Sequence, residues 1–300
     1  MTSHLPDTPC YLNGQFVPLR NAQVSVMDRG FIFGDGLYEV VPVYAGQPFR
    51  FAQHMARLER SLTEMRITNP HTRDQWREIA MQLVAHGAAA AGIPAKSLDQ
   101  MVYIQITRGV AMRDHVMPTN ITPTVFAMAN TMRTPDMAQR TAGVACVTAN
   151  DFRWEKAHIK TTSLLGAVFA RQISFDAGAL ETVMFRHGFL SEGAASNVWV
   201  VKDGRVMGPP RDNLVLEGIR YGLIEECCRA LGLEFALQPI SRDEVWAADE
   251  LLLSSATKEV LAITTLDGQP VGHPSHRGLP GPVCARLHAA YQDAKLTSTA

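Results

Sequence analysis

Alternating hydrophobic residues and turn residues in the first 130 positions predict an antiparallel sheet. Asn13-Gly14 joins two short apolar stretches in "CYLNGQFVPL", a pattern typical of a two-residue hairpin. A second hairpin, "LYEVVPVYAGQPFRF", turns at Ala45-Gly46, and Pro42 in its first strand indicates an edge or a bulge. The stretches "MVYIQITRG" and "TPTVFAMAN" read as two further strands and bracket the loop "VAMRDHVMPTNI".

Two helices are expected between the second hairpin and these later strands. In "FAQHMARLERSLTEMRI" apolar residues recur every three or four positions, and a second helix is expected around 73–91. The stretch "NTMRTPDM" that follows the last strand is polar, contains a proline and lacks periodicity. We therefore expect a small N-terminal domain over 1–131, an interdomain linker at 132–137 and a large C-terminal domain over 138–300.

The second half of the chain alternates between strand and helix patterns. Strands are expected at about 143–149, 181–186, 197–201 and 250–255, and helices at about 162–176, 218–232 and 283–294. The fold class that follows is α+β or mixed α/β, without internal repeats.

Composition and charge exclude several classes of protein. A chain of 300 residues with 46% hydrophobic and 19% charged residues can bury a sizeable core, most simply in two domains. A net charge of -1 provides no general attraction to nucleic acid or to an acidic membrane surface. The first residues lack the basic and apolar regions of a signal peptide, and no apolar run is long enough to span a membrane. We expect neither nucleic acid nor membrane as a partner.

Cysteine usage indicates a reducing compartment. The five cysteines are odd in number, Cys227 and Cys228 are adjacent, and no C-x-x-C pair occurs, which fits neither a disulfide framework nor a zinc site. We therefore expect a cytoplasmic protein without a bound metal.

Motifs of four common chemistries are absent. The chain has no G-x-S-x-G elbow, no H-E-x-x-H and no Walker loop, and "FGDGLY" lacks the third glycine of a dinucleotide fingerprint. Gly30, Gly34 and Gly36 in "DRGFIFGDG" are compatible with a phosphate cradle, but a glycine-rich turn between strands is the favoured interpretation.

Lysine is scarce, which draws attention to Lys160. Only six of the 28 basic residues are lysines, and Lys160 stands directly before three hydroxyl residues and an expected helix. Thr161, Thr162 or Ser163 could cap that helix and fix the position of a nucleophilic amine. Position alone favours a solvated lysine at a helix boundary, because most lysines lie at the surface.

Three other stretches carry residues suited to binding either a protonated ring nitrogen or an anion. In "SEGAASNVWV", Glu192 precedes a buried strand and could pair with a protonated ring nitrogen, as pyridoxal phosphate chemistry requires. In "LEGIRYGLIEE", backbone amides at a helix start could point at an anion, and "SSAT" at 254–257 adds hydroxyls. Arg57 could grip the same anion with two N–H groups. Each feature by itself is better explained as an ordinary turn, cap or surface residue.

Taken together, these stretches resemble the fold type IV pyridoxal-phosphate aminotransferases. This family contains D-amino-acid, branched-chain and (R)-amine transaminases and aminodeoxychorismate lyase, and the stretches are most similar to the D-amino-acid aminotransferases. The resemblance runs from about residue 11 to 265 and includes "DRGFIFGDGLYEVVPVY", "ITRGVAMRDHVMP", "DFRWEKAHIKTTSLLGAVFARQ", "SEGAASNVWVVKDG" and "LEGIR". It implies an α+β protein with a small N-terminal α/β domain and a larger, barrel-like mixed α/β domain that binds pyridoxal 5′-phosphate.

The resemblance assigns roles to individual residues. Lys160 matches the Schiff-base lysine that holds the cofactor aldehyde as an internal aldimine and then moves the substrate proton, and Glu192 matches the carboxylate on the ring nitrogen. The other residues expected to bind the cofactor are Arg57, Ile219, Arg220, Ser255, Ala256 and Thr257 for the phosphate, Leu216 for one ring face, and Asn197.

Substrate choice is expected to depend on "RDH". Arg113 and His115 lie two residues apart in an extended loop, so they face the same way and can clamp a carboxylate. In D-amino-acid aminotransferases this pair traps the substrate α-carboxylate from the partner subunit, together with a tyrosine that corresponds to Tyr38. The resemblance therefore implies a homodimer, whereas the residues alone would suggest a solvated loop.

The expected activity is a ping-pong transfer of an amino group from a D-amino acid such as D-alanine to a 2-oxo acid such as 2-oxoglutarate. An (R)-amine transaminase, a branched-chain L-amino-acid aminotransferase and an aminodeoxychorismate lyase remain alternatives. The chain also departs from close relatives, because Arg220 and Ala256 replace threonines and Ala194 and Ala195 replace serines. Fewer hydroxyls near the phosphate suggest a looser hold on the cofactor.

Overall fold

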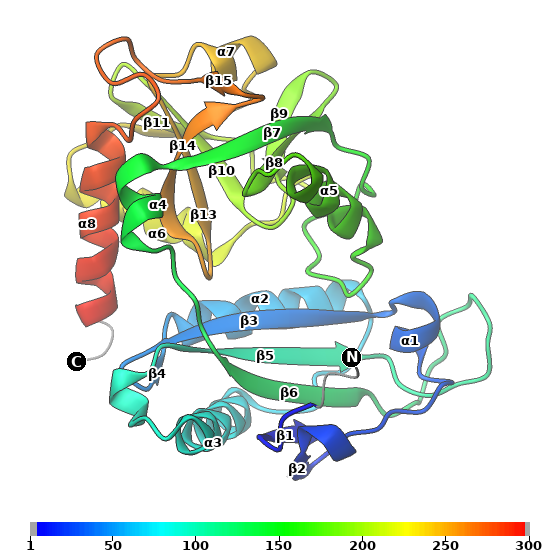
Figure 1. The fold of residues 1–300 in the computed structure, drawn as a ribbon. Helices are drawn as coiled ribbons and strands as arrows, with labels where there is room; N and C mark the ends of the chain where they lie inside the picture. Colours follow the sequence, from blue (N-terminus) through cyan, green and yellow to red (C-terminus); the bar gives the residue numbers. More distant parts are fainter. Residues whose placement is uncertain (1–4, 298–300) are drawn as a thin grey trace. The chain divides into compact units, whose positions relative to one another are not determined.

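The structure, a computed structural model, describes residues 5–297, which divide into two compact units (Figure 1). The first unit comprises the described residues up to Arg133 together with Ile159–Leu164. The second comprises Thr134–His158 and Leu165–Thr297. The short segment that contains Lys160 therefore belongs by its contacts to the first unit, although it follows the expected linker in sequence.

The described part of the first unit forms a six-stranded antiparallel sheet in the order β2-β1-β6-β5-β3-β4. Helices α2 (Phe51–Glu64) and α3 (Arg73–Ala91) pack on it and bury Leu58, Trp76 and Leu83 in one core. The strands are β1 (Pro9–Leu12), β2 (Gln15–Pro18), β3 (Gly36–Tyr44), β4 (Gln47–Pro48), β5 (Gln100–Thr107) and β6 (Thr124–Thr131).

Both expected hairpins are confirmed, as are the two helices. Asn13 and Gly14 have φ values of 46° and 94°, and Ala45 and Gly46 have 48° and 76°, as a two-residue turn with a left-handed backbone requires. Because β4 has only two residues, β3 is an edge strand over most of its length, which accommodates Pro42.

The glycines of "DRGFIFGDG" form a turn between elements, as favoured from the sequence. Gly34 ends the short helix α1 (Arg29–Phe33) with φ 66°, a left-handed conformation that suits glycine. A Cβ on Gly30 would overlap the side chain of Thr107 at the end of β5. The glycines thus allow α1 to lie close to β5.

The described part of the second unit is a nine-stranded mixed sheet curled into a half-barrel (Figure 1). Its order is β12-β11-β10-β13-β14-β7-β8-β9, with β15 beside β14. The strands are β7 (Val144–Asn150), β8 (Glu181–Arg186), β9 (Phe189–Gly193), β10 (Asn197–Lys202), β11 (Arg205–Gly208), β12 (Phe235–Leu237), β13 (Glu250–Ser255), β14 (Glu259–Leu266) and β15 (Gln269–Pro270). The helices are α4 (Met137–Ala142), α5 (Leu165–Asp176), α6 (Ile219–Ala230), α7 (Arg242–Trp246) and α8 (Pro282–Thr297).

Helix α5 begins later than the sequence suggested. It was expected from residue 162 with a threonine or serine cap, but it starts at Leu165. The hydroxyls of Thr162 and Ser163 donate instead to the carbonyl oxygen of Gly34, at 2.9 and 3.0 Å. Those hydrogen bonds tie the residues after Lys160 to the first unit.

Helix α8 is held at its start by a carboxylate from β13. The backbone N–H groups of Val283 and Cys284 each donate to Glu250 at 2.8 Å, and a Cβ on Gly281 would overlap this side chain. Such a carboxylate satisfies amides that lack partners within the helix. Across residues 5–297, no helix combines the length and apolar character needed to cross a membrane.

Candidate active site

The backbone of Lys160 is fixed by pairing with the start of β3. The N–H of Tyr38 donates to the carbonyl oxygen of Lys160, and the N–H of Thr162 donates to that of Gly36, both at 2.9 Å. Ile159 is buried in the core of the first unit. Lys160 therefore has a defined position within this unit rather than lying in a mobile solvated loop.

The amine of Lys160 lies against an aromatic ring. Its Nζ is 4.1 Å from the centroid of the Tyr38 ring, which itself lies 5.7 Å from the Tyr103 ring. The lysine is half-buried. Lys160 and Tyr38, two of the residues selected from the sequence, are thus neighbours.

Arg57 is buried on α2 in an ion pair with Glu39 of β3. Its Nε and Nη2 donate to the two Glu39 carboxylate oxygens at 2.7 Å, and His54 Nδ1 lies 2.7 Å from Oε2. Burial alone would raise the pKa of Glu39, but Arg57 and His54 outweigh burial and bring that pKa well below its usual range. Arg57 is therefore held rigidly, and its role as a phosphate ligand stays a prediction.

Arg113 and His115 meet the same side chain of α1. The Arg113 guanidinium carbon is 5.4 Å from the centroid of the Phe33 ring, and the His115 ring centroid is 5.5 Å from it. Both residues are exposed to solvent. Phe33 thus brings together the two side chains that the sequence selected as a carboxylate clamp.

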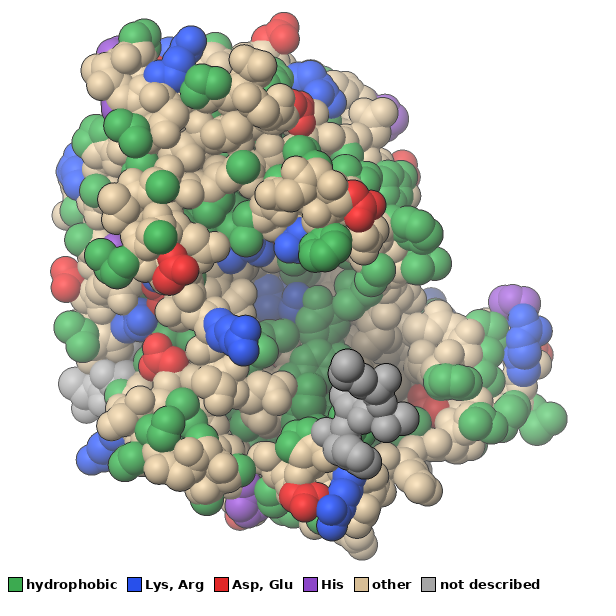
Figure 2. All heavy atoms as spheres, in the orientation of Figure 1, with side chains coloured by type: hydrophobic (Ala, Val, Ile, Leu, Met, Phe, Trp, Pro, Cys, Tyr) green, Lys and Arg blue, Asp and Glu red, His purple; other side chains and the backbone are tan. Residues whose placement is uncertain are grey.

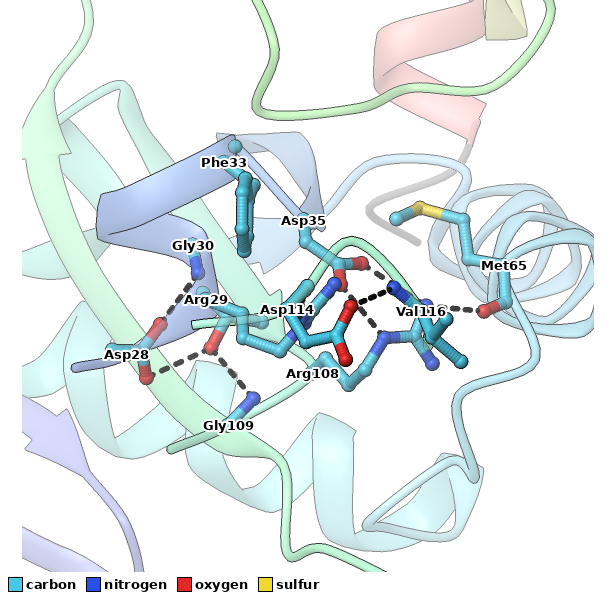
Figure 3. Close-up of polar contacts among 12 residues, drawn as sticks. Asp28, Arg29, Gly30, Phe33, Asp35, Met65, Arg108, Gly109, Asp114 and Val116 are labelled. Atoms are coloured by element: carbon cyan, nitrogen blue, oxygen red, sulfur yellow. Dashed lines mark hydrogen bonds and ion pairs between the residues drawn. The ribbon is translucent and has the colours of Figure 1, made fainter. Parts of the chain in front are cut away.

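The base of this loop is anchored by a buried ion cluster of Arg29, Asp35 and Arg108, called here the Asp35 cluster (Figure 3). Arg29 Nε and Arg108 Nε donate to the same Asp35 oxygen at 2.7 and 2.8 Å. Arg29 also donates to the carbonyl oxygen of Asp114, which lies between Arg113 and His115. The cluster therefore fixes the loop at its centre.

The Asp35 cluster also reaches the end of α2. Arg108 donates to the carbonyl oxygens of Met65 and Arg66, at 2.7 and 3.2 Å. Burial opposes ionisation of Asp35, but Arg108 and Arg29 outweigh it and lower the pKa of this carboxyl group. One ionised carboxylate thus joins α1, α2 and the end of β5.

In the second unit, Glu192 lies at the centre of a hydrogen-bonded group. It is 4% exposed and accepts from Arg153 Nη1 at 2.7 Å, Asn197 Nδ2 at 3.1 Å and the N–H of Leu216 at 3.2 Å. Burial raises the pKa of Glu192, and Arg153 and the Leu216 N–H oppose that rise. Glu192 is therefore a buried carboxylate, not the exposed turn residue that its sequence context alone would suggest.

Asn197 connects Glu192 to the loop before α6. Its Nδ2 also donates to the carbonyl oxygen of Leu216 at 3.0 Å, and a Cβ on Gly218 would overlap its Oδ1. Glycine at 218 is therefore needed for this close approach. The structure thus brings together three residues selected from the sequence, Glu192, Asn197 and Leu216.

The first turn of α6 and the turn between β13 and β14 form a second group. The N–H groups of Ile219 and Arg220 lie in the first turn of α6, the part of a helix that is suited to binding anions. Arg220 is 2% exposed and donates through Nη2 to Tyr291 of α8 at 2.7 Å and to the Ala256 carbonyl at 3.5 Å. Its guanidinium thus links α6, α8 and the turn that contains Ala256.

The same turn carries the remaining residues selected as phosphate ligands. Ser255 ends β13 and accepts from the N–H of Lys258 at 3.0 Å, and Thr257 lies between them. Lys258 in turn pairs with the buried Glu181 at 3.0 Å, which orders the turn.

The second unit therefore offers the groups that pyridoxal 5′-phosphate needs. A buried carboxylate is suited to a protonated ring nitrogen, and helix-start amides beside an ordered turn are suited to a phosphate. Arg220, which stands where the resemblance expects a threonine, offers no hydroxyl but links the start of α6 to α8 and to the turn that contains Ala256.

Two important residues were missed from the sequence. Arg153, in "DFRWEK", contacts Glu192, and Tyr291 contacts Arg220. The available signal for Arg153 was an arginine two residues after Asp151, in the loop that follows the expected strand at about 143–149. Nothing local marked Tyr291, because its partner lies 71 residues away.

Comparisons with known proteins show the family to which the chain is similar. Residues 36–266 match the family model described as amino-transferase class IV. The chain is 33% identical over 288 residues to a D-alanine aminotransferase of Bacillus licheniformis, which covers 96% of this chain and 97% of the relative. It is also 33% identical over 284 residues to a D-alanine aminotransferase of Staphylococcus aureus, covering 94% and 96%.

Solved structures show the same fold. A branched-chain aminotransferase of the archaeon Thermoproteus uzoniensis has a TM-score of 0.82, with 22% identity and coverage of 97% of this chain and 95% of that one. The branched-chain amino acid aminotransferase of Escherichia coli has a TM-score of 0.81, with 23% identity and coverage of 95% and 93%.

Replacing Asp35 by Asn should lower the free energy of unfolding at neutral pH by about 2–3 kcal/mol, because two buried arginines lose their shared carboxylate. The Asp35 pKa is lowered on folding, so its contribution is complete above the unfolded pKa of about 3.9 and is lost as the pH falls through the folded value. Urea denaturation at a series of pH values should show the difference shrinking in acid. Asp114→Asn, at an exposed position, is the control, and a difference independent of pH would contradict the ion cluster.

Proposed function

The chain belongs to the class IV aminotransferases, and we propose that it moves the amino group of a D-amino acid such as D-alanine to a 2-oxo acid such as 2-oxoglutarate. Fold type IV aminotransferases depend on pyridoxal 5′-phosphate, so this is the cofactor. The observation that carries the substrate assignment is the pair Arg113 and His115, held against Phe33 as a clamp for an α-carboxylate. The relatives named D-alanine aminotransferase support it.

We assign the cofactor to the residues that were selected from the sequence. Lys160 provides the primary amine for the aldehyde, Glu192 pairs with the ring nitrogen, Asn197 holds Glu192, and Leu216 packs on the ring. The phosphate is assigned to Arg57, to the amides of Ile219 and Arg220, and to Ser255, Ala256 and Thr257. Arg57 and the α6 amides remain donors at any physiological pH, as a phosphate site requires.

When bound, pyridoxal 5′-phosphate accepts the electrons released as the substrate α-proton departs, and it carries the amino group from one substrate to the other. Lys160 Nζ takes that proton from the substrate Cα and returns it to the other reacting carbon as a general acid. An amine accepts a proton only in its neutral form. The Nζ of Lys160 packs against the Tyr38 ring, a contact made without a carboxylate.

One carboxylate clamp serves both half-reactions. The amino acid and the 2-oxo acid each carry an α-carboxylate, and Arg113 offers it a planar, permanently charged fork, while His115 adds a second donor. The hydrogen bond from Arg29 to the Asp114 carbonyl fixes the loop between them. The clamp selects substrates that have an α-carboxylate, and the rest of the pocket selects among substrate side chains.

Other activities of the family are weaker candidates. An (R)-amine transaminase needs an apolar surface where the carboxylate binds, which the Arg113 and His115 pair disfavours. A branched-chain L-amino-acid aminotransferase and an aminodeoxychorismate lyase differ from the proposed enzyme in product. The solved branched-chain enzymes share the fold at 22–23% identity, which carries no argument about substrate.

We further propose a homodimer in which the 110–117 loop completes the partner's site. The loop exposes Val110, Met112, Val116 and Met117, which are 49–84% exposed. Figure 2 shows hydrophobic side chains gathered on the projecting part at the right of the view, where this loop lies. Apolar surface of this kind is typical of a protein interface.

The second unit exposes an apolar helix face that supports the same proposal. Leu165, Val168, Phe169 and Ile173 recur at helical spacing along α5 and are 39–69% exposed. The opposite face of α5 buries Ala170 and Ser174 against the sheet. A helix with one face packed on the sheet and a second, apolar face exposed is suited to burial on both sides.

We place the protein in the cytoplasm. All five cysteines are buried as free thiols, a state that a reducing compartment maintains.

Absorbance of the bound cofactor tests the substrate class directly. We expect D-alanine to reduce the visible band of the purified holoenzyme, and 2-oxoglutarate to restore it, because both substrates fit one carboxylate clamp. L-leucine and (R)-1-phenylethylamine, added to separate samples, should act far more slowly. If only the L-amino acid or only the amine reduces the band, the protein is still an aminotransferase, but the proposed D-amino-acid substrate is wrong. Release of pyruvate from aminodeoxychorismate would identify the lyase.

Replacing Arg113 by Ala should lower kcat/KM for D-alanine about thirtyfold or more, because a charge-assisted pair with the carboxylate is lost. Activity with (R)-1-phenylethylamine, which has no carboxylate, should not fall. Steady-state kinetics of both substrates would be compared with those of Met112→Ala, at an exposed neighbouring position. Unchanged turnover of D-alanine would remove Arg113 from the substrate site.

Mixing two strongly impaired variants tests the shared site. Lys160→Ala lacks the amine and Arg113→Ala lacks the clamp, so a hybrid dimer has one complete site only if the loop acts in the partner subunit. After subunit exchange we expect about one quarter of the wild-type activity with D-alanine, since random pairing makes half of the dimers hybrids. Sedimentation would confirm that dimers are present. Hybrids without activity would show that the loop serves its own subunit.

A further inference from the structure

Arg153 stands between two buried carboxylates of the second unit. Its Nη1 donates to Glu192 Oε1 at 2.7 Å, and its Nε and Nη2 donate to the two oxygens of Asp151 at 3.0 and 2.8 Å. The side chain is 13% exposed. All three nitrogens of the guanidinium are thus engaged, which fixes the plane of the fork.

The two oxygens of Glu192 differ in what they already bind. Oε1 accepts from Arg153 and from the N–H of Leu216, at 2.7 and 3.2 Å. Among residues 5–297, Oε2 accepts one hydrogen bond, from Asn197 at 3.1 Å. A carboxylate oxygen has two lone pairs, so Oε1 is filled while Oε2 has room for one more donor.

We propose that Arg153 is a positioning residue that turns Oε2 of Glu192 toward the ring N–H of the cofactor and keeps its negative charge in place. The inference rests on the proposed function, because it takes Glu192 as the partner of the ring nitrogen. Arg153 acts only through Glu192 and does not touch the cofactor.

Charge gives the reason for an arginine at this position. Burial favours the neutral form of Glu192, yet the ring nitrogen stays protonated only beside an ionised carboxylate. Arg153 opposes the effect of burial, and a guanidinium does not release its own proton at physiological pH. A neutral residue at 153 would leave Glu192 buried without a counter-charge.

Arg153 is itself held by a further shell of residues. Arg186 Nη2 lies 3.2 Å from Asp151 and donates to the carbonyl oxygen of Arg153 at 3.0 Å. A Cβ on Gly166, in the first turn of α5, would lie 3.0 Å from Arg153 Cγ, so glycine leaves room for the arginine stem. The Arg153 guanidinium is therefore confined to one position.

The test compares two ligands that differ only at the ring nitrogen. Pyridoxamine 5′-phosphate and its analogue with C–H in place of that nitrogen would be titrated calorimetrically into the cofactor-free protein. Neither ligand forms a covalent bond with Lys160, so each titration measures reversible binding. The variants are Arg153→Met, Arg153→Lys, Glu192→Gln and the control Arg186→Met, which lies in the same cluster without contacting Glu192.

Arg153→Met should weaken binding of pyridoxamine 5′-phosphate about tenfold to a hundredfold, and binding of the carbon analogue far less. Glu192→Gln should likewise weaken binding of pyridoxamine 5′-phosphate more than binding of the carbon analogue. Arg153→Lys should show a smaller difference between the two ligands, because it keeps the charge but loses the fork. Arg186→Met should affect both ligands equally. Melting temperatures would be recorded for every variant. If Arg153→Met does not fold, the Arg153→Lys titrations decide.

The outcomes distinguish a failure of the role proposed for Arg153 from a failure of the role proposed for Glu192. If Arg153→Met, or the lysine variant in its place, weakens both ligands equally while Glu192→Gln discriminates, Arg153 has only a structural role and the Glu192 assignment stands. If Glu192→Gln also fails to discriminate, the ring nitrogen has another partner, and both the inference and that part of the proposed function are wrong.

Discussion

A carboxylate buried at Glu192 is the constraint on which the second unit depends. Removing an ionised group from water costs several kcal/mol unless hydrogen bonds and an opposite charge replace the solvent. Here Arg153, Asn197 and the N–H of Leu216 do so. They come from the loop after β7, from β10 and from the loop before α6. One charge thus requires three distant segments to meet, and the same meeting holds the loop before α6 against Glu192.

The first unit also buries carboxylates, and it too pairs them with arginines. Glu39 is paired with Arg57, and Asp35 is shared by Arg29 and Arg108. In each case a guanidinium fork satisfies several acceptors at once, including backbone carbonyls at the end of α2 and in the loop of Arg113. A lysine amine is a point charge and cannot match two carboxylate oxygens in one plane. The forked geometry of arginine thus suits the buried ion pairs of Asp35, Glu39 and Glu192.

Local patterns predicted the fold well, and long-range partners explain what they missed. The two hairpins, α2, α3 and the fold type IV architecture followed from turn residues, apolar spacing and family motifs. The start of α5 was wrong, because Thr162 and Ser163 bond to Gly34, 128 and 129 residues away. Short strands such as β11 and β12 have too few residues to show a period. The neighbours Glu192, Asn197 and Leu216 were selected individually, whereas Arg153 was missed because its partner is 39 residues distant.

The placement of Lys160 follows from the same distribution of cations. Lys202, Lys258 and Lys295 each pair with a carboxylate, as arginines do throughout the chain. Lys160 lies over the Tyr38 ring and is fixed by backbone pairing with β3 instead. An aromatic face attracts an ammonium group through its ring electrons, so the Tyr38 ring helps to place the Lys160 amine. Guanidinium groups thus form the buried ion pairs of Asp35, Glu39 and Glu192, whereas backbone pairing and an aromatic ring place the Lys160 amine.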